Sequence, residues 1–369
     1  MKKLITFSIL TYLLITINSG AANQSTNKNN LGNEKILRVG VLLPLSGEFQ
    51  GIGDSFLKAI QLALYDISNE DIKIYPKDNK GNALNSYLSA KEFEEQDINI
   101  VIGPIFFESL ERFGEIKDGF CDVDVLFHFA ADPEVRTGYD NPEDSFEQNI
   151  VNTFKLLQKI KHTKIKKFVF ASSSSVYGDA EIVPTDEEYG PLSPISHYGA
   201  SKLACEAMVS SFCHNYDIEG VILRPANVIG LRGRHGLIWD LVHKLKNNQN
   251  ELELLGNGKQ TKSFIHISDA ITGIFSAINN IKKKVEVFNL GSDDSVEIMD
   301  VAKVVCKNAG LENIKINTTG GVDDGRGWKG DIKIAHLDIS KLKKLGWNPK
   351  SSSIDAANTT SNEIISEVM

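Results

Sequence analysis

The fold is decided by F-V-F-A-S-S-S-S-V-Y-G at residues 168–178 and by S-H-Y-G-A-S-K-L-A-C at residues 196–205. The first segment is an unbroken apolar run that ends in hydroxyl side chains, which is typical of a parallel strand buried on both faces of a sheet. Open α/β sheets bind their ligands at the carboxyl ends of such strands. The segment therefore predicts an α/β fold with a binding site close to the serines.

The second segment places Tyr198 and Lys202 one turn apart on a predicted helix. One face of that helix is apolar and carries Cys205, Met208, Val209 and Phe212. An ammonium group beside a phenol lowers the phenol's pKa from its usual value of about 10, so Tyr198 would become a proton acceptor for an alcohol that is being oxidised. A Tyr and a Lys at this spacing are also common on exposed helix faces, so the pair alone is a weak signal.

The surrounding residues make the signal specific. Ser173 stands 25 residues before Tyr198, and V-Y-G follows at 176–178. This combination strongly resembles the extended short-chain dehydrogenase/reductase family, and within it the UDP-glucose 4-epimerases and dehydratases. The resemblance implies NAD as cofactor, a nucleotide-diphosphate sugar as substrate and a homodimer. It also implies that Ser173 hydrogen-bonds the sugar hydroxyl, that Tyr198 exchanges the proton, and that Lys202 holds the nicotinamide ribose and tunes the tyrosine.

The resemblance runs from about residue 118 to residue 348. It implies a doubly wound parallel Rossmann-like sheet and a smaller C-terminal substrate domain built around 227–267 and 288–331. The segment D-V-D-V-L-F-H-F-A-A-D would place Ala130 and Ala131 against the cofactor, with His128 in the core. Asn149 matches the family residue that packs on the tyrosine loop and the cofactor; an ordinary helix-surface amide is the alternative.

Further along the chain, the resemblance assigns the substrate contacts to three residues. Asn227 would reach the sugar diphosphate, and Arg326 would be a phosphate ligand. Lys262 stands where many members of the family carry Arg, so a point charge replaces a bidentate fork. Arg224, on a strand before Asn227, would be structural.

The first residues are typical of an exported protein. A short basic start, an apolar run from Leu4 to Ile17 and small residues at 19–21 predict a secretory signal peptide over 1–22. The polar stretch 23–35 is expected to be a linker. The signal peptide predicts a periplasmic or secreted protein without membrane contact after cleavage, whereas the family resemblance implies a cytoplasmic one.

Residues 36–110 have a β-α-β-α-β rhythm of their own. Gly47, Gly51 and Gly53 have the spacing of a loop that binds dinucleotide pyrophosphate, and Asp78 could take a ribose hydroxyl. The flanking V-G-V-L-L-P-L-S-G and I-V-I-G-P instead resemble the first lobe of periplasmic binding proteins of the branched-chain amino-acid type, which cell-wall synthase activators share. We favour the second interpretation, because a glycine loop alone is a weak signal and a signal peptide agrees with export.

The family's G-x-x-G-x-x-G motif, whose backbone amides bind the cofactor pyrophosphate, does not occur in register before residue 118. We therefore expect a chimera of a partial lobe (36–110), an epimerase-like domain (111–348) and a C-terminal tail or helix (349–369). Such a chimera would bind NAD weakly and have at most trace epimerase activity. An exported non-enzymatic ligand-binding module and an inactive fusion are the alternatives.

Composition limits the remaining possibilities. The chain is 41% hydrophobic and 24% charged, as in globular proteins, and its net charge of −8 gives no basic stripe for nucleic acid. The four cysteines lack C-x-x-C spacing and the histidines show no ligand pairing, so we expect neither a metal site nor a disulfide framework.

Overall fold

The computed structural model describes residues 36–67, 71–96, 98, 100–104, 124–161, 163 and 165–369. The predicted signal peptide and linker lie outside the described residues. The chain divides into two compact units. The larger contains Val125–Phe154 and Lys166–Met369, and the smaller lies within Leu13–Asp124 and Lys155–Ile165. Helix α5 (Asn152–Ile160) begins in the larger unit and ends in the smaller.

The main sheet of the larger unit has the strand order β11-β6-β5-β4, and every neighbouring pair is parallel. Its strands are β4 (Val125–His128), β5 (Lys167–Ala171), β6 (Glu219–Pro225) and β11 (Val285–Leu290). Phe168, Val169 and Phe170 of β5 are at most 1% exposed, so β5 is buried on both faces. The parallel α/β fold predicted from the apolar run is confirmed.

Two long helices cover opposite faces of this sheet. Because side chains alternate along a strand, Val169 faces away from Phe168 and Phe170. Val169 belongs to a core that includes Ala270 and Ile274 of α8 (Ile267–Asn279). On the other face, α6 (His197–Asn215) lies over the sheet, with the Lys202 ammonium 5.1 Å from the centre of the Phe170 ring. Helices α8 and α6 therefore lie on opposite faces of the sheet.

Short helical segments complete this part of the unit. They are η2 (Thr137–Tyr139), α4 (Pro142–Ser145), the π-helix η3 (Phe146–Val151), η4 (Ser174–Tyr177) and α10 (Ser340–Lys344).

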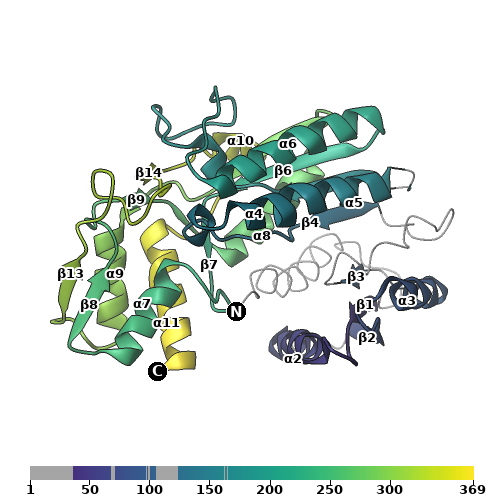
Figure 1. Ribbon diagram of the computed structural model, residues 1–369, viewed down its shortest axis with the longest axis horizontal. Helices are drawn as coiled ribbons and strands as arrows, with labels where there is room; N and C mark the ends of the chain where they lie inside the picture. The colour runs from purple at the N-terminus through teal and green to yellow at the C-terminus, as the bar shows by residue number, and fades with distance from the viewer. Residues whose placement is uncertain are drawn as a thin grey trace, which may run out of the picture. The chain divides into compact units, whose positions relative to one another are not determined.

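The rest of the larger unit is built from small sheets and three helices. The pairs are β10 (Phe264–His266) with β7 (Asn227–Ile229) and β13 (Lys315–Thr318) with β8 (Glu251–Leu254). A third sheet has the order β12-β9-β14, from Val296–Glu297, Thr261–Lys262 and Ile334–Ala335. Helices α7 (Leu237–Asn247), α9 (Ile298–Asn308) and α11 (Ser353–Val368) share one apolar core and lie side by side in Figure 1. The predicted C-terminal tail or helix is thus a helix, and it packs against this region.

The described residues of the smaller unit form a three-stranded parallel sheet and two helices. Its order is β2-β1-β3, from Ile72–Asp78, Leu37–Leu43 and Ile100–Ile102, with helices α2 (Gln50–Ile67) and α3 (Ala83–Glu95). Both edges of β1 are therefore occupied, and its neighbours are the second and third strands. This is the flavodoxin-like order; the six-stranded dinucleotide-binding order places the first strand beside the second and the fourth.

Within the ranges described, no helix has the length and apolar character that crossing a membrane requires.

Candidate functional site

Ser173 and Tyr198 come together at the carboxyl end of β5. Ser173 follows the strand and caps η4, because its Oγ accepts a hydrogen bond from the backbone N–H of Ser175 at 3.1 Å. Tyr198 lies in the first turn of α6, where the Ser196 hydroxyl accepts from the N–H of Gly199 at 3.0 Å. The Ser173 side chain lies close enough to the Tyr198 phenol to lower the pKa of that phenol. The structure thus brings together the serine and tyrosine that the sequence separates by 25 positions.

Lys202 lies beneath this pair. Its side chain is 3% exposed, its ammonium donates to the carbonyl of Ala171 at 2.8 Å, and it lies 5.7 Å from the centre of the Tyr198 ring. Burial lowers the pKa of Lys202 to about 8, against the opposing charges of Cys205 and Glu206. The ammonium is therefore fixed at the end of β5, where it faces the tyrosine ring.

The expected fall in the pKa of Tyr198 does not occur in the ligand-free protein. Burial raises the pKa of Tyr198 to about 12, the contact with Ser173 opposes this rise, and the negative charge of Asp132 adds to it. Desolvation of the phenolate is the largest contribution and decides the direction of the shift in pKa. A second positive charge would be needed to make the phenolate accessible near neutral pH.

Asn149 ties the loop after β4 to helix α6. Its Oδ1 accepts from the N–H of Asp132 at 2.7 Å, and its Nδ2 donates to the carbonyl of Asp132 at 3.1 Å and to the Ser201 hydroxyl at 2.9 Å. Asn149 is 2% exposed, so it is not a surface amide, and it lies in the π-helix, a feature frequent at functional sites. Ala130 and Ala131 precede Asp132 in the loop that it holds, and Ala130 is exposed there.

The predicted core position of His128 is confirmed. The side chain is 8% exposed and its Nε2 lies 2.8 Å from the Thr153 hydroxyl oxygen. Burial, assisted by the charge of Lys202, lowers the pKa of His128 to about 3, so the imidazole is neutral.

A buried ion pair that the sequence analysis missed anchors α6 to the sheet. Arg224 of β6 donates to both carboxylate oxygens of Glu206, at 2.9 and 2.7 Å, and the side chains are 5% and 7% exposed. The Ser172 hydroxyl donates to the same carboxylate at 2.5 Å, and the Arg224 guanidinium lies 4.8 Å from the centre of the Tyr177 ring. Glu206 stands four residues after Lys202 on a buried helix face, which is the signal that could have found it. The structural role expected of Arg224 is thus a charge-assisted anchor.

The three predicted substrate residues lie in the smaller sheets and the adjoining loop. Asn227 begins β7, is exposed, and donates from Nδ2 to the carbonyl of Ser263 at 3.0 Å. Lys262 ends β9 and donates to Asp331 Oδ1 at 2.7 Å. Arg326 forms a bidentate pair with Asp179, at 3.0 and 2.6 Å. Both candidate phosphate ligands therefore face carboxylates in the ligand-free protein.

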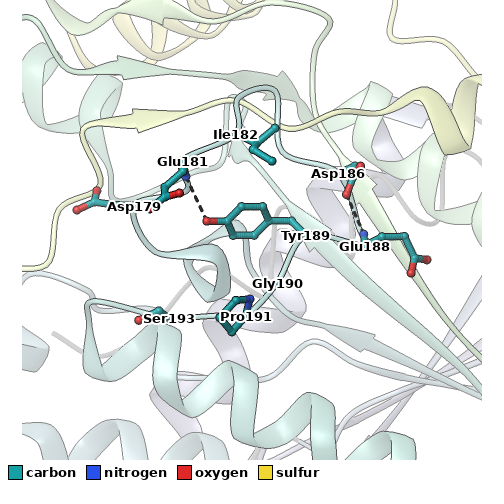
Figure 2. Close-up of a pocket in the computed structure, with 9 residues that line it drawn as sticks. All are labelled: Asp179, Glu181, Ile182, Asp186, Glu188, Tyr189, Gly190, Pro191 and Ser193. Carbon is teal, nitrogen blue, oxygen red and sulfur yellow. Dashed lines mark hydrogen bonds between the residues drawn. The ribbon is translucent and has the colours of Figure 1, made fainter.

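A cavity of about 580 Å³ lies beside this region in the loop between β5 and α6. Figure 2 shows Tyr189 at its centre, with the phenol oxygen accepting from the N–H of Glu181 at 3.2 Å. Asp179, Glu181, Asp186 and Glu188 contribute four carboxylates to its lining. None of the predicted site residues lines this cavity, and its acidic character does not suit an anionic ligand.

The glycine loop of the smaller unit joins β1 to α2. A Cβ on Gly53 would lie 2.0 Å from the carbonyl oxygen of Pro44, so only glycine permits this close approach of helix and strand. Gly47 has a φ of +80°, and no heavy atom lies within 4 Å of a Cβ built on Gly47 or Gly51. The backbone here is open, as a phosphate-binding loop would require.

Asp78, considered as a ribose ligand, is already engaged by this loop. Its Oδ1 accepts from the N–H groups of Leu45 and Lys80 at 2.8 and 2.9 Å, and its Oδ2 accepts from the Ser46 hydroxyl at 2.5 Å. These hydrogen bonds lower the pKa of Asp78 against the opposing effect of burial. Its side chain therefore holds the loop in shape, and both of its oxygens are occupied. Among the residues that the structure describes, no three His, Cys, Asp or Glu side chains are grouped to hold a metal ion.

Comparison with known families shows the family of the chain. The model of the NAD dependent epimerase/dehydratase family matches residues 83–291, which include Ser173, Tyr198 and Lys202. The chain belongs to the NAD-dependent epimerase/dehydratase family. The match begins at Ala83, so helix α3 and strand β3 of the smaller unit also lie within it.

Relatives and solved structures of this family cover most of the chain. A putative UDP-glucose 4-epimerase of Methanocaldococcus jannaschii is 32% identical over 239 residues, which is 63% of this chain and 74% of the relative. The crystal structure of a UDP-galactose 4-epimerase is 30% identical with a TM-score of 0.63, and the similarity covers 90% of this chain and 100% of that one. The UDP-glucuronic acid 4-epimerase of Bacillus cereus, in complex with UDP-glucuronic acid and NAD, is 25% identical with a TM-score of 0.66 over the same shares.

Proposed function

We propose that this epimerase/dehydratase family member acts on a UDP-sugar, using NAD, through Ser173, Tyr198 and Lys202. The observation that carries the proposal is the position of the Lys202 ammonium, which is buried at the carboxyl end of β5 and lies 5.7 Å from the centre of the Tyr198 ring, with Ser173 two residues beyond the same strand. A proton carrier, a hydroxyl that orients a sugar alcohol and a fixed cation are the groups that oxidation of an alcohol requires. The similar proteins named above, which are UDP-sugar 4-epimerases, support the same substrate class.

Each residue has a distinct role in this proposal. Tyr198 takes the proton of the sugar hydroxyl and later returns it, and Ser173 orients that hydroxyl. Lys202 would hold the nicotinamide ribose hydroxyls, and its charge favours the phenolate. When bound, NAD would supply the hydride acceptor and a positive charge. Asn149 keeps the loop that carries Ala130 and Ala131 fixed relative to α6.

The larger unit contains groups that suit a nicotinamide ribose, namely the phenol, the ammonium and the loop at Ala130 and Ala131. The smaller unit, taken by itself, has an open backbone at Gly47 and Gly51, but its Asp78 carboxylate is occupied by hydrogen bonds within the same unit. The order β2-β1-β3 also leaves β1 without the fourth-strand neighbour of a dinucleotide-binding sheet. We therefore propose that NAD binds weakly, and that the purified protein carries no stoichiometric nicotinamide.

We assign the substrate diphosphate to Asn227, Lys262 and Arg326. The side chains of Lys262 and Arg326 are 14% and 15% exposed, so a phosphate bound there would be partly shielded from water. Lys262 offers a point charge where a guanidinium would offer two parallel donors. We therefore expect Lys262 to bind the diphosphate less tightly than an arginine at the same position would.

We also propose that residues 1–22 direct export and that 36–110 is a partial binding-protein-like lobe in front of the epimerase-like domain 111–348. Two observations favour a binding-protein-like lobe over a nucleotide-binding loop. The smaller unit has the flavodoxin-like strand order, and Asp78 is hydrogen-bonded to the loop after β1. Expression with a C-terminal tag, followed by fractionation and N-terminal sequencing, tests the export. A mature start near residue 23 in the periplasmic fraction would support it, and an intact Met1 start in the cytoplasm would refute it.

The enzymatic proposal is tested by turnover of UDP-sugars with added NAD. UDP-glucose, UDP-glucuronic acid and UDP-N-acetylglucosamine would be incubated with the protein and followed by NMR at the anomeric protons. We expect slow interconversion at C4 that depends on added NAD. Binding of leucine or another amino acid to the smaller unit, without any turnover, would instead favour the binding-module function.

A further inference from the structure

Four charged side chains at the predicted phosphate site neutralise one another. Lys262 donates to Asp331 Oδ1 at 2.7 Å and to the carbonyl of Ile332. Arg326 donates from Nη1 and Nη2 to the two oxygens of Asp179, at 3.0 and 2.6 Å, and from Nη1 to the carbonyl of Asp331 at 2.5 Å. Two cations thus face two carboxylates, so the cluster as a whole offers no net charge to an anion.

The two carboxylates differ in how firmly they are held. Asp331 is 5% exposed, and its Oδ2 also accepts from the N–H of Gly327 at 3.0 Å, so it belongs to the fold of its own segment. The Asp179 side chain is 43% exposed and lies in the loop after η4, 147 positions away from Arg326 in the sequence. Asp179 can turn into water at little desolvation cost, whereas Asp331 would lose buried hydrogen bonds.

We propose that Asp179 is a displaceable counter-ion of Arg326, which a nucleoside diphosphate must replace and which therefore sets the affinity of the site. This inference rests on the proposed function, because it takes Lys262 and Arg326 as the ligands of the substrate's phosphates. The Arg326 fork that now binds a carboxylate has the geometry that binds two phosphate oxygens. A partly exposed ion pair contributes little stability, so a doubly charged diphosphate can displace it.

The position of Asp179 also limits where the diphosphate binds. Asp179 lines the acidic cavity together with Glu181, Asp186 and Glu188 (Figure 2). A diphosphate placed in that cavity would face four carboxylates, so the anion belongs on the Arg326 side of Asp179. When displaced, Asp179 leaves the guanidinium for water.

Titration calorimetry with UDP as the probe tests the inference. Asp179→Asn keeps the size of the side chain and removes its charge, so UDP should bind roughly threefold to tenfold more tightly than to the wild type. Asp324→Asn is the matched control: its carboxylate lies in the same segment as Arg326, is paired with Lys333 at 3.3 Å and is 91% exposed. The control should change the affinity less than about twofold, because exposed charges are well screened.

A double-mutant cycle separates displacement from general charge repulsion. In an Arg326→Gln background, which should itself weaken UDP binding, Asp179→Asn should no longer tighten it, because the competition for the guanidinium is gone. Equal affinities of Asp179→Asn and Asp324→Asn, or an undiminished effect in the Arg326→Gln background, would overturn the inference while leaving the proposed function standing. Absence of UDP binding in the wild type and in every variant would overturn the proposed function, and the inference with it.

Discussion

Truncation of Glu206 should destabilise the larger unit strongly, because it leaves the Arg224 charge buried without a partner. Arg224 is 5% exposed in this ion pair and loses two hydrogen bonds, of 2.9 and 2.7 Å, when the carboxylate is removed. Its Nη1 already has no hydrogen-bond partner among the described residues, and the Ser172 hydroxyl would lose its acceptor as well. Breaking a buried pair from one side costs about 3–5 kcal/mol, so we expect Glu206→Ala to lower the unfolding free energy by that amount.

The measurement is urea unfolding followed by tryptophan fluorescence. The chain has three tryptophans, Trp239, Trp328 and Trp347, and all lie in the larger unit, so the signal reports on that unit. Glu253→Ala is the control, since Glu253 forms an ion pair with Lys244 at 3.1 Å but is 61% exposed, and it should cost less than about 1 kcal/mol. A Glu206→Ala variant that loses no more stability than Glu253→Ala would refute the anchor role of the pair.

Three further predictions concern other contacts. Gly53→Ala should lower the unfolding free energy of the smaller unit by about 1–3 kcal/mol, since its Cβ would lie 2.0 Å from the Pro44 carbonyl oxygen. Gly51→Ala meets no atom within 4 Å and should be neutral or stabilising. Hydrogen exchange of the β1 amides measures both variants, and equal effects would contradict the packing argument. Because the pKa of His128 falls from 6.5 to about 3 on folding, its neutral ring contributes fully to the unfolding free energy above pH 6.5. This contribution is lost as the pH falls towards 3, with a slope of up to about 1.4 kcal/mol per pH unit. His128→Gln should remove that slope, and parallel curves of unfolding free energy against pH for the two proteins would show that the ring does not titrate this way. Lys202→Ala should weaken NAD binding roughly tenfold or more, as measured by calorimetry. Lys303 is exposed, so Lys303→Ala is the control and should leave the NAD affinity unchanged. An unaltered NAD affinity in Lys202→Ala would exclude Lys202 from the cofactor site.

The parts of the site that sequence predicts well are those fixed by short-range geometry. The apolar run at 168–171 forms β5, and the spacing of four between Tyr198 and Lys202 places both on one face of α6. The i, i+4 rule alone is enough to put the ammonium beside the phenol. The meeting of Ser173 and Tyr198 came from the family resemblance, because no local rule brings the end of a strand to the start of a later helix.

The parts that were missed depend on contacts between distant residues. Asp179 and Arg326 stand 147 positions apart, and either could have been a surface charge. The pKa of Tyr198 depends on how deeply the folded chain buries the phenol, which the Tyr/Lys spacing does not determine. The β-α-β-α-β rhythm does not determine which strands pair with β1, because it is compatible with both strand orders of a doubly wound sheet. The sequence analysis did not identify Glu206, although a carboxylate on a buried helix face requires a cationic partner, which here is Arg224.

The central claim, that Tyr198 carries the proton in a nucleotide-sugar reaction, is tested most directly by NMR-monitored turnover of the UDP-sugars at millimolar added NAD. Tyr198→Phe keeps the ring and removes the phenol oxygen, so it should abolish turnover while leaving the urea unfolding midpoint close to that of the wild type. Tyr189→Phe, which removes a phenol from the acidic cavity in the loop before α6, is the matched control and should retain the wild-type rate. We predict NAD-dependent C4 interconversion in the wild type and in Tyr189→Phe and none in Tyr198→Phe; equal turnover in all three proteins, or no turnover of any UDP-sugar in the wild type, would contradict the account.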